Sequence, residues 1–254
     1  MKAGNRSSRI MTLVAEQAAQ RGARVDLRDV CTAAVAALPV GGAGISAMST
    51  SVANYPLCST DGTSEQLEEL QLTLGEGPCV DAFTGSVPIL TPDMADSELQ
   101  DSWPVFATEA LTLGAVAIFA LPLQIGAISP GVLDLYASKP GPLGAEDLAD
   151  ALAFADLATL ILLDSVHGGP AGMPDNKEEE TGYALEANGY RAEIDQATGI
   201  LTVQLGVGID EAFVRLRAHA FTHGHRITHV AADVVAHRLR FRPDAEPYRT
   251  DQDR

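Results

Sequence analysis

The segment at residues 168–181 constrains the fold of this chain most strongly, because it offers almost nothing that a protein core could bury. It combines glycines and prolines with the acidic run Glu178-Glu179-Glu180. That composition is typical of a linker. A chain of 254 residues is long enough for two domains. We therefore predict one domain at residues 1–167, a linker at 168–184, a second domain at 185–242 and a disordered tail at 243–254.

The two predicted domains differ in charge. The first 185 residues contain 24 acidic and 8 basic residues, a net −16, whereas the remainder contains 10 and 9, a net −1. Six arginines lie between residues 211 and 242, where the acidic residues are only Glu211 and Asp233. A locally basic module attached to an acidic one indicates two roles, with any polyanion bound at the C-terminal end. The overall charge of −17 opposes nonspecific binding of nucleic acid.

The first domain alternates between helical and strand-like patterns. Helical spacing of apolar residues covers residues 11–20, 26–38, 66–74, 103–113 and 145–166. Strand patterns cover residues 43–50, 55–59, 87–90, 115–124 and 131–137, the last two flanking a turn at 126–130. Helices around about five antiparallel strands predict an α+β domain.

The second domain is predicted to be all-helical. Its helices are expected at residues 185–205, 210–222 and 228–239, with Gly224 ending the second and Thr228 capping the third. Pro243 ends the pattern, and the residues after it are predicted to be frayed. Three short helices form a bundle whose core is too thin for a catalytic cleft.

Three ordered blocks in this bundle resemble the ANTAR domain, the RNA-binding output module of transcription antiterminators. The blocks are Gln196-Ala197-Thr198-Gly199-Ile200-Leu201, Glu211-Ala212-Phe213 with Leu216-Arg217 and Ala220, and Arg226-Ile227 with Val230-Ala231. Many ANTAR domains have Lys or Arg at the position of Thr198, so this chain has one fewer cation for phosphate there.

The acidic domain resembles a GAF domain. The resemblance is carried by Leu74-Gly75-Glu76-Gly77-Pro78-Cys79-Val80-Asp81-Ala82, which is similar to GAF domains fused to ANTAR domains in actinobacterial regulators. The two resemblances together imply a sensor joined to an RNA-binding effector. They imply an α+β GAF-like sensor domain followed by a small three-helix ANTAR bundle, in a protein that forms a homodimer.

The predicted RNA contacts combine this resemblance with the basic cluster. A guanidinium binds phosphate in a bidentate manner or stacks on an unpaired base of an RNA loop. Gly199 in a helix costs about 1 kcal/mol relative to Ala, which is tolerated where another helix or an RNA backbone approaches closely. The predicted contacts are Gln196, Thr198, Gly199, Arg215, Arg217, Arg226 and Arg238.

Other residue types indicate no further chemistry. His219, His223, His225 and His229 have metal-like spacing, but no Cys accompanies them and Gly224 interrupts the helix, so surface histidines are expected rather than a metal site. Cys31, Cys58 and Cys79 are expected to be buried thiols in a reducing cytoplasm, and Cys79 is not expected to carry a chromophore. We predict no cofactor, and no catalytic residues because no phosphate loop, nucleophile elbow or zinc-protease helix is present.

The chain is expected to be cytoplasmic, since no apolar run approaches the ~18 residues that cross a bilayer and no signal peptide begins it. The resulting hypothesis is an antitermination regulator whose partners are RNA hairpins in nascent transcripts and, in the GAF-like domain, a small molecule. Two alternatives remain. Three helices with a basic third helix resemble a DNA-binding helix-turn-helix. A ligand-binding scaffold whose C-terminal bundle oligomerises through Phe213, Leu216 and Ala220 is the other.

Overall fold

A computed structural model describes residues 3–48, 55–167 and 182–242. The chain divides into two compact units, Met1–Asn188 and Gly189–Arg254. The division lies close to the domain boundary predicted at residues 184 and 185. The predicted linker and tail lie outside the described residues, apart from the three residues 182–184, which begin a helix.

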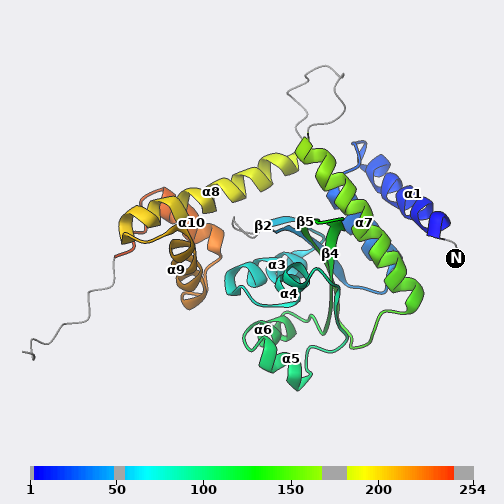
Figure 1. The fold of residues 1–254 in the computed structure, drawn as a ribbon, viewed down its shortest axis with the longest axis horizontal. Coiled ribbons are helices and arrows are strands. Elements are labelled where there is room, and N and C mark those ends of the chain that lie inside the picture. Colours follow the sequence, from blue (N-terminus) through cyan, green and yellow to red (C-terminus); the bar gives the residue numbers. More distant parts are fainter. Residues whose placement is uncertain (1–2, 49–54, 168–181, 243–254) are drawn as a thin grey trace, which may run out of the picture. The chain divides into compact units, whose positions relative to one another are not determined.

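The N-terminal unit contains one antiparallel sheet in the order β2-β1-β5-β4-β3. Figure 1 shows the sheet, with β2, β5 and β4 labelled. Its strands are β1 (Gly42–Ala47), β2 (Tyr55–Ser59), β3 (Ile89–Thr91), β4 (Ala117–Ile125) and β5 (Ile128–Ala137). Strands β4 and β5 form a hairpin in which Ile125 pairs with Ile128, with Gly126 at a φ of 60° in the turn. A positive φ favours glycine, which explains this residue in the turn. The five-stranded α+β prediction is confirmed.

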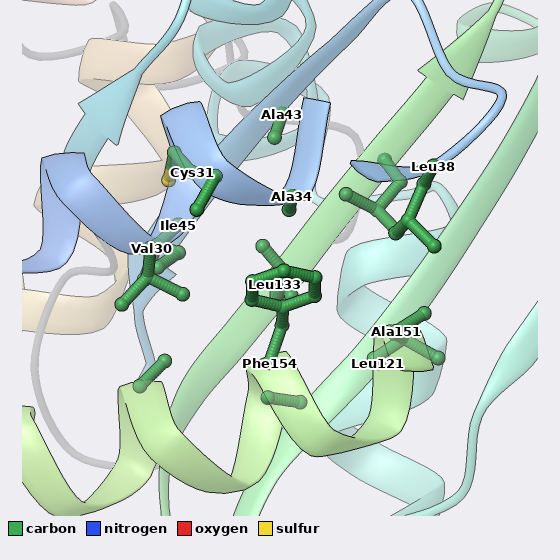
Figure 2. Packing of buried hydrophobic residues seen from close by; sticks show 14 of the residues in the cluster. Val30, Cys31, Ala34, Leu38, Ala43, Ile45, Leu121, Leu133, Ala151 and Phe154 are labelled. Carbon is green, nitrogen blue, oxygen red and sulfur yellow. The ribbon is translucent and has the colours of Figure 1, made fainter. Parts of the chain in front are cut away.

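One face of the sheet packs against α2 (Leu27–Ala37) and α7 (Ala145–His167), and α1 (Ala3–Arg21) packs against these two helices. Figure 2 shows this core, in which Phe154 of α7, Ala34 of α2 and Leu133 of β5 are fully buried. Side chains alternate between the two faces of a strand. Leu121 and Leu133, which pair across β4 and β5, therefore point into this core, whereas their neighbours face the other side.

The opposite face is covered by α3 (Gly62–Leu74), α4 (Pro78–Gly85) and α6 (Phe106–Thr112). A further short helix, α5 (Ser97–Ser102), precedes α6. The sequence did not predict α4 or α5, and the helix predicted at residues 103–113 is the shorter α6. Helices of six to eight residues complete too few turns for the spacing of apolar residues to show.

The Gly75-Glu76-Gly77-Pro78 segment connects the helices of this face. Gly75 ends α3 in the left-handed conformation, with a φ of 68°. The Glu76 carboxylate accepts hydrogen bonds from the backbone N–H groups of Val105 and Phe106 at 3.0 and 2.9 Å, at the start of α6. Pro78 is the first residue of α4, where a missing N–H costs no helical hydrogen bond. The motif therefore positions α3, α4 and α6 together.

The C-terminal unit contains most of α8 (Gly182–Leu205), whose first residues belong to the N-terminal unit, and all of α9 (Ile209–Thr222) and α10 (Ile227–Val235). Its buried hydrophobic residues come from all three helices: Ile194, Ala197, Leu201, Ala212, Leu216, Ala220, Ile227, Val230, Ala231 and Val234. The predicted three-helix bundle is confirmed. The segment after α10 contacts α8 and α9. The Phe241 N–H donates to Gln204 Oε1 at 2.9 Å, and the Phe241 ring lies 5.0 Å from that of His219.

Two details of α10 differ from the prediction. Arg226 rather than Thr228 is its N-cap residue, and the helix ends at Val235 rather than 239. His237 has a φ of 58°, a left-handed conformation that ends a helix. The Arg238 and Leu239 N–H groups then both donate to the Asp233 carbonyl, at 2.8 and 3.0 Å.

No single helix in the described part of the chain is long and apolar enough to cross a membrane. The helical stretches Ala192–Leu205 and Ile209–Thr222 satisfy the length and composition criteria only as a pair, and that pair is bent by 105°.

Candidate nucleic-acid interface

Helix α9 carries two of the predicted RNA contacts. Arg215 Nη2 lies 3.1 Å from the Glu211 carboxylate, one helical turn earlier. Arg217 lies with its guanidinium carbon 5.7 Å from the centre of the Phe213 ring. Burial lowers the pKa of the half-buried Arg217 guanidinium. Arg217 therefore has a packing role within the module in addition to its predicted RNA contact.

The other two predicted arginines flank α10. Arg226 is exposed and caps the helix with its backbone in an extended conformation. Arg238 is exposed as well, and its guanidinium forms an ion pair of 2.7 Å with Asp233. An exposed ion pair of this kind is worth at most about 1 kcal/mol, so it does not prevent Arg238 from binding phosphate instead.

The other three predicted contacts lie on α8, where two are exposed and one is buried. Gln196 and Gly199 are exposed. Thr198 is only 4% exposed, and its hydroxyl donates to the Ile194 carbonyl at 2.7 Å. A buried hydroxyl already bonded within its own helix has no free donor for RNA, so the structure argues against Thr198 as a contact. Its place on the inner side of α8, next to the fully buried Ala197, is the physical reason.

Gly199 does not mediate close packing within the described residues. A Cβ atom added there would meet nothing within 4 Å. Of the two explanations for a glycine at this point of the helix, approach by a neighbouring helix therefore loses its support, and approach by a ligand remains.

Three histidines cluster at the end of α9. The His219 and His223 rings stack with centroids 4.0 Å apart, and the His225 ring lies 6.3 Å from that of His223. Burial lowers the pKa of His219, and the neighbouring His223 and His225 lower it further. In the described ranges the histidines do not form a group with metal-ligand spacing.

A cluster that the sequence did not predict lies in the N-terminal unit, between α3, α4 and the sheet. Glu68, Cys79 and Asp134 are buried there, with ligand atoms within 4.8 Å of one another. We call these three residues the buried acidic cluster. Burial, and then the Asp134 charge, raise the pKa of Glu68. Burial raises the pKa of Asp134 to about 6, and burial followed by the charges of Asp134 and Glu68 raises that of the Cys79 thiol.

Comparisons with solved structures concern the N-terminal unit. The GAF domain of a phosphoenolpyruvate-protein phosphotransferase from Coxiella burnetii is 13% identical over 66% of this chain and 98% of its own, with a TM-score of 0.47. The GAF-B domain of DevS from Mycobacterium smegmatis is 18% identical over 56% of this chain and 93% of its own, with a TM-score of 0.41. A free methionine-R-sulfoxide reductase from Thermoplasma acidophilum is 14% identical over 60% and 96%, with a TM-score of 0.43. At such identities and TM-scores, no ligand or activity is transferred to this chain.

A search of curated proteins gave no match in sequence to this chain. The family model of the ANTAR domain matches residues 184–235. The matched range contains most of α8, all of α9 and all of α10. The C-terminal module of this chain, residues 184–235, is therefore an ANTAR domain.

Proposed function

We propose that this protein is an RNA-binding regulator of transcription antitermination. The observation that carries the proposal is the ANTAR domain at residues 184–235, folded as a three-helix module with Arg226 exposed on it and Arg238 exposed just after it. Its ANTAR domain binds the loops of hairpins in nascent RNA. A hairpin held by the protein cannot pair into the competing terminator stem, so polymerase continues.

The proposed contacts are Gln196, Gly199, Arg215, Arg217, Arg226 and Arg238. Thr198 is not among them, because its hydroxyl is buried and bonded within α8. Gln196 and Gly199 lie on the exposed side of α8, and the four arginines lie on or next to α9 and α10. Guanidinium groups suit phosphate and unpaired bases, which are the parts of an RNA loop that a protein reaches.

Filter binding of the full chain to paired-hairpin RNAs and to a scrambled RNA of equal length tests this function. Binding of the hairpins at low salt, with the scrambled RNA bound much more weakly, is the expected result. Equal binding of both RNAs would contradict it. Competition with duplex DNA separates the helix-turn-helix alternative, since DNA that displaces the hairpins more effectively than RNA would favour it.

The scaffold alternative loses the apolar surface on which it depended. Leu216 and Ala220 are fully buried within the ANTAR unit, and Phe213 is half-buried beneath Arg217. Side chains already used in a module's own core cannot also mediate association with another copy.

We also propose that the protein acts in the cytoplasm as a homodimer with a sensing N-terminal domain. Leu152 and Leu160 on α7 are 38% and 55% exposed, although the stripe of α7 toward the sheet is buried. Sedimentation at micromolar concentration is expected to show a dimer, and Leu160→Lys is expected to shift it toward monomer. A monomer with and without RNA would contradict this part of the proposal.

A separate experiment tests whether the C-terminal unit binds RNA without the N-terminal unit. The net −16 of the first 185 residues repels RNA, so a fragment starting at residue 182 is expected to bind hairpins more tightly than the full chain. Limited proteolysis is expected to cleave first within residues 168–181. A fragment that binds no RNA while the full chain does would show that the N-terminal unit contributes to the interface.

A further inference from the structure

The buried acidic cluster places three metal-binding side chains from separate parts of the chain at one point. Glu68 comes from α3, Cys79 from α4 and Asp134 from β5. Glu68 is 2% exposed and Asp134 is 6% exposed, and Cys79 is equally buried. Buried carboxylates are rare in proteins unless they are paired with a cation or coordinate a metal.

Neither carboxylate has a cationic partner in the described part of the chain. Ser46 Oγ donates a hydrogen bond to Glu68, and Gln71 Nε2 donates one to Asp134 Oδ2 at 3.0 Å. Asp134 Oδ1 is buried and accepts no hydrogen bond from an amide or hydroxyl group, and the polar side chains beside the Asp134 carboxylate include the other two members of the cluster, Glu68 and Cys79. An unsatisfied buried carboxylate oxygen is costly, and it indicates a group that binds there.

The surrounding residues are arranged to hold these three side chains. Asp134 pairs with Gly44 across β1 and β5, and a Cβ atom on Gly44 would lie 2.5 Å from Glu68 Oε1. Glycine at this position therefore gives the Glu68 carboxylate its place against the sheet. Gln71 links the other two ligands, because its Oε1 accepts the Cys79 N–H at 2.7 Å while its Nε2 binds Asp134. Such outer contacts orient the ligands in protein metal sites.

The space at the cluster suits a single ion. A pocket beside the cluster, lined by Glu68 and Asp134 but not by Cys79, has a volume of about 10 Å³. That volume is about the size that one water molecule requires, which is too small for an organic ligand. The Cys79 sulfur also lies 3.9 Å from the Met48 sulfur, a second soft atom near the site.

We propose that Glu68, Cys79 and Asp134 form a binding site for a divalent transition metal ion of the zinc class. One thiolate with two carboxylates is a ligand set for such an ion, whereas Mg²⁺ and Ca²⁺ take oxygen ligands alone. Ligand atoms of a tetrahedral zinc site lie about 3.5 Å apart. Side-chain rotations that move the ligand atoms by about 1 Å would therefore bring them to bonding distance of the ion. Water or Met48 completes the coordination.

This site deepens the proposed function by naming the class of signal that the N-terminal unit detects. It involves residues of the N-terminal unit alone, so it stands or fails independently of RNA binding. A protein that binds metal but no hairpin RNA would retain this proposal and lose the other.

The test uses the full chain, reduced and freed of metal, titrated with Co²⁺ as a spectroscopic probe. A thiolate-to-cobalt absorption band in the near ultraviolet that saturates at one equivalent is expected, and Zn²⁺ is expected to displace it. Cys79→Ser should abolish the band, and Glu68→Gln or Asp134→Asn should weaken Co²⁺ binding at least tenfold. The absence of a band in the unmodified protein would overturn the proposal.

The matched control removes the other two thiols. Cys31 and Cys58 lie with their sulfur atoms 2.9 Å apart in the core on the opposite face of the sheet. In the double variant Cys31→Ser/Cys58→Ser the band should persist, because only Cys79 supplies it. A band that survives Cys79→Ser, or that disappears in the double variant while Cys79 remains, would assign the metal elsewhere.

Thermal melting separates loss of the site from loss of the fold. Metal-free Asp134→Asn should melt no lower than the unmodified protein, since the change removes one of two neighbouring buried carboxylates. Zn²⁺ should raise the melting temperature of the unmodified protein and leave that of Asp134→Asn unchanged. An equal rise in both proteins would contradict the assignment.

Discussion

The Arg21 guanidinium binds the Asp29 carboxylate through two hydrogen bonds, Nε to Oδ1 at 2.8 Å and Nη2 to Oδ2 at 2.7 Å. The pair joins the last residue of α1 to the first turn of α2. Asp29 is 1% exposed and also accepts the Asp26 N–H, which completes the capping box of α2. Its partner Asp29, through a side-chain hydrogen bond, raises the pKa of Arg21.

Arg21→Ala is expected to destabilise the N-terminal unit by about 3 kcal/mol, because it leaves the buried Asp29 charge without its partner. Urea unfolding followed by circular dichroism measures the change. Arg24→Ala is the matched control, since Arg24 is exposed in the same connection and its loss should cost less than about 0.5 kcal/mol. Similar losses in the two variants would show that Asp29 does not depend on Arg21.

Gly199→Ala is expected to change stability and RNA binding in opposite directions. A Cβ at this position meets nothing within 4 Å, so the variant should gain up to about 1 kcal/mol of helix stability. If an RNA backbone approaches Gly199, the added methyl group should weaken hairpin binding. Unfolding and filter binding on the same sample measure both effects, and unchanged binding would remove Gly199 from the interface.

Ala197→Leu is expected to reduce stability directly and RNA binding only as a consequence. Ala197 is fully buried, and a larger side chain in a filled core costs about 1–3 kcal/mol. Hairpin binding should fall only as far as the folded fraction falls. A binding defect at full folding, measured by circular dichroism at the assay temperature, would place Ala197 in the interface instead.

Arg226→Ala is expected to weaken binding to every hairpin alike and to reduce the salt dependence. Each lost phosphate contact to a single-stranded loop should lower the slope of log K against log salt by about 0.7. Folding should be retained because Arg226 is exposed. Arg217→Ala should lose stability as well, since Arg217 packs over Phe213. Arg24→Ala, in the N-terminal unit, should leave the slope unchanged.

The ANTAR domain is expected to lose stability on acidification through His219. Its pKa in the folded state is lowered by burial and then by His223 and His225. An imidazole with a lowered folded pKa stabilises the fold fully above its unfolded pKa of about 6.5, and this stability is lost as the pH falls toward the folded pKa. Urea unfolding at pH 7.5 and 5.5 measures the free energy of unfolding at each pH. The decrease between the two pH values should be smaller for His219→Gln than for the unmodified protein. His229→Gln, at an exposed position, should behave like the unmodified protein.

Local patterns in the sequence predicted most of the helices and strands of both units. Helix α3 ends at Leu74, the end predicted from the sequence, because Gly75 after it adopts the left-handed conformation that ends a helix. The strand predicted at residues 55–59 is β2 itself. The three blocks around Gln196, Phe213 and Arg226 predicted the ANTAR domain that the family model matches at residues 184–235. Helix α4 was missed, since its two turns are too short for a period to appear.

Only the tertiary structure decided which residues work together. Thr198 and Gly199 are neighbours in sequence, yet one is buried and the other exposed, because Thr198 lies on the helical stripe of Ile194, Ala197 and Leu201 that the folded module buries. Glu68, Cys79 and Asp134 follow no ligand spacing along the chain and meet where α3 and α4 cross the sheet. Residue type and spacing carry the information for helices and strands, whereas a site built from three distant segments exists only once the sheet pairs β5 with β1 and the helices cover it.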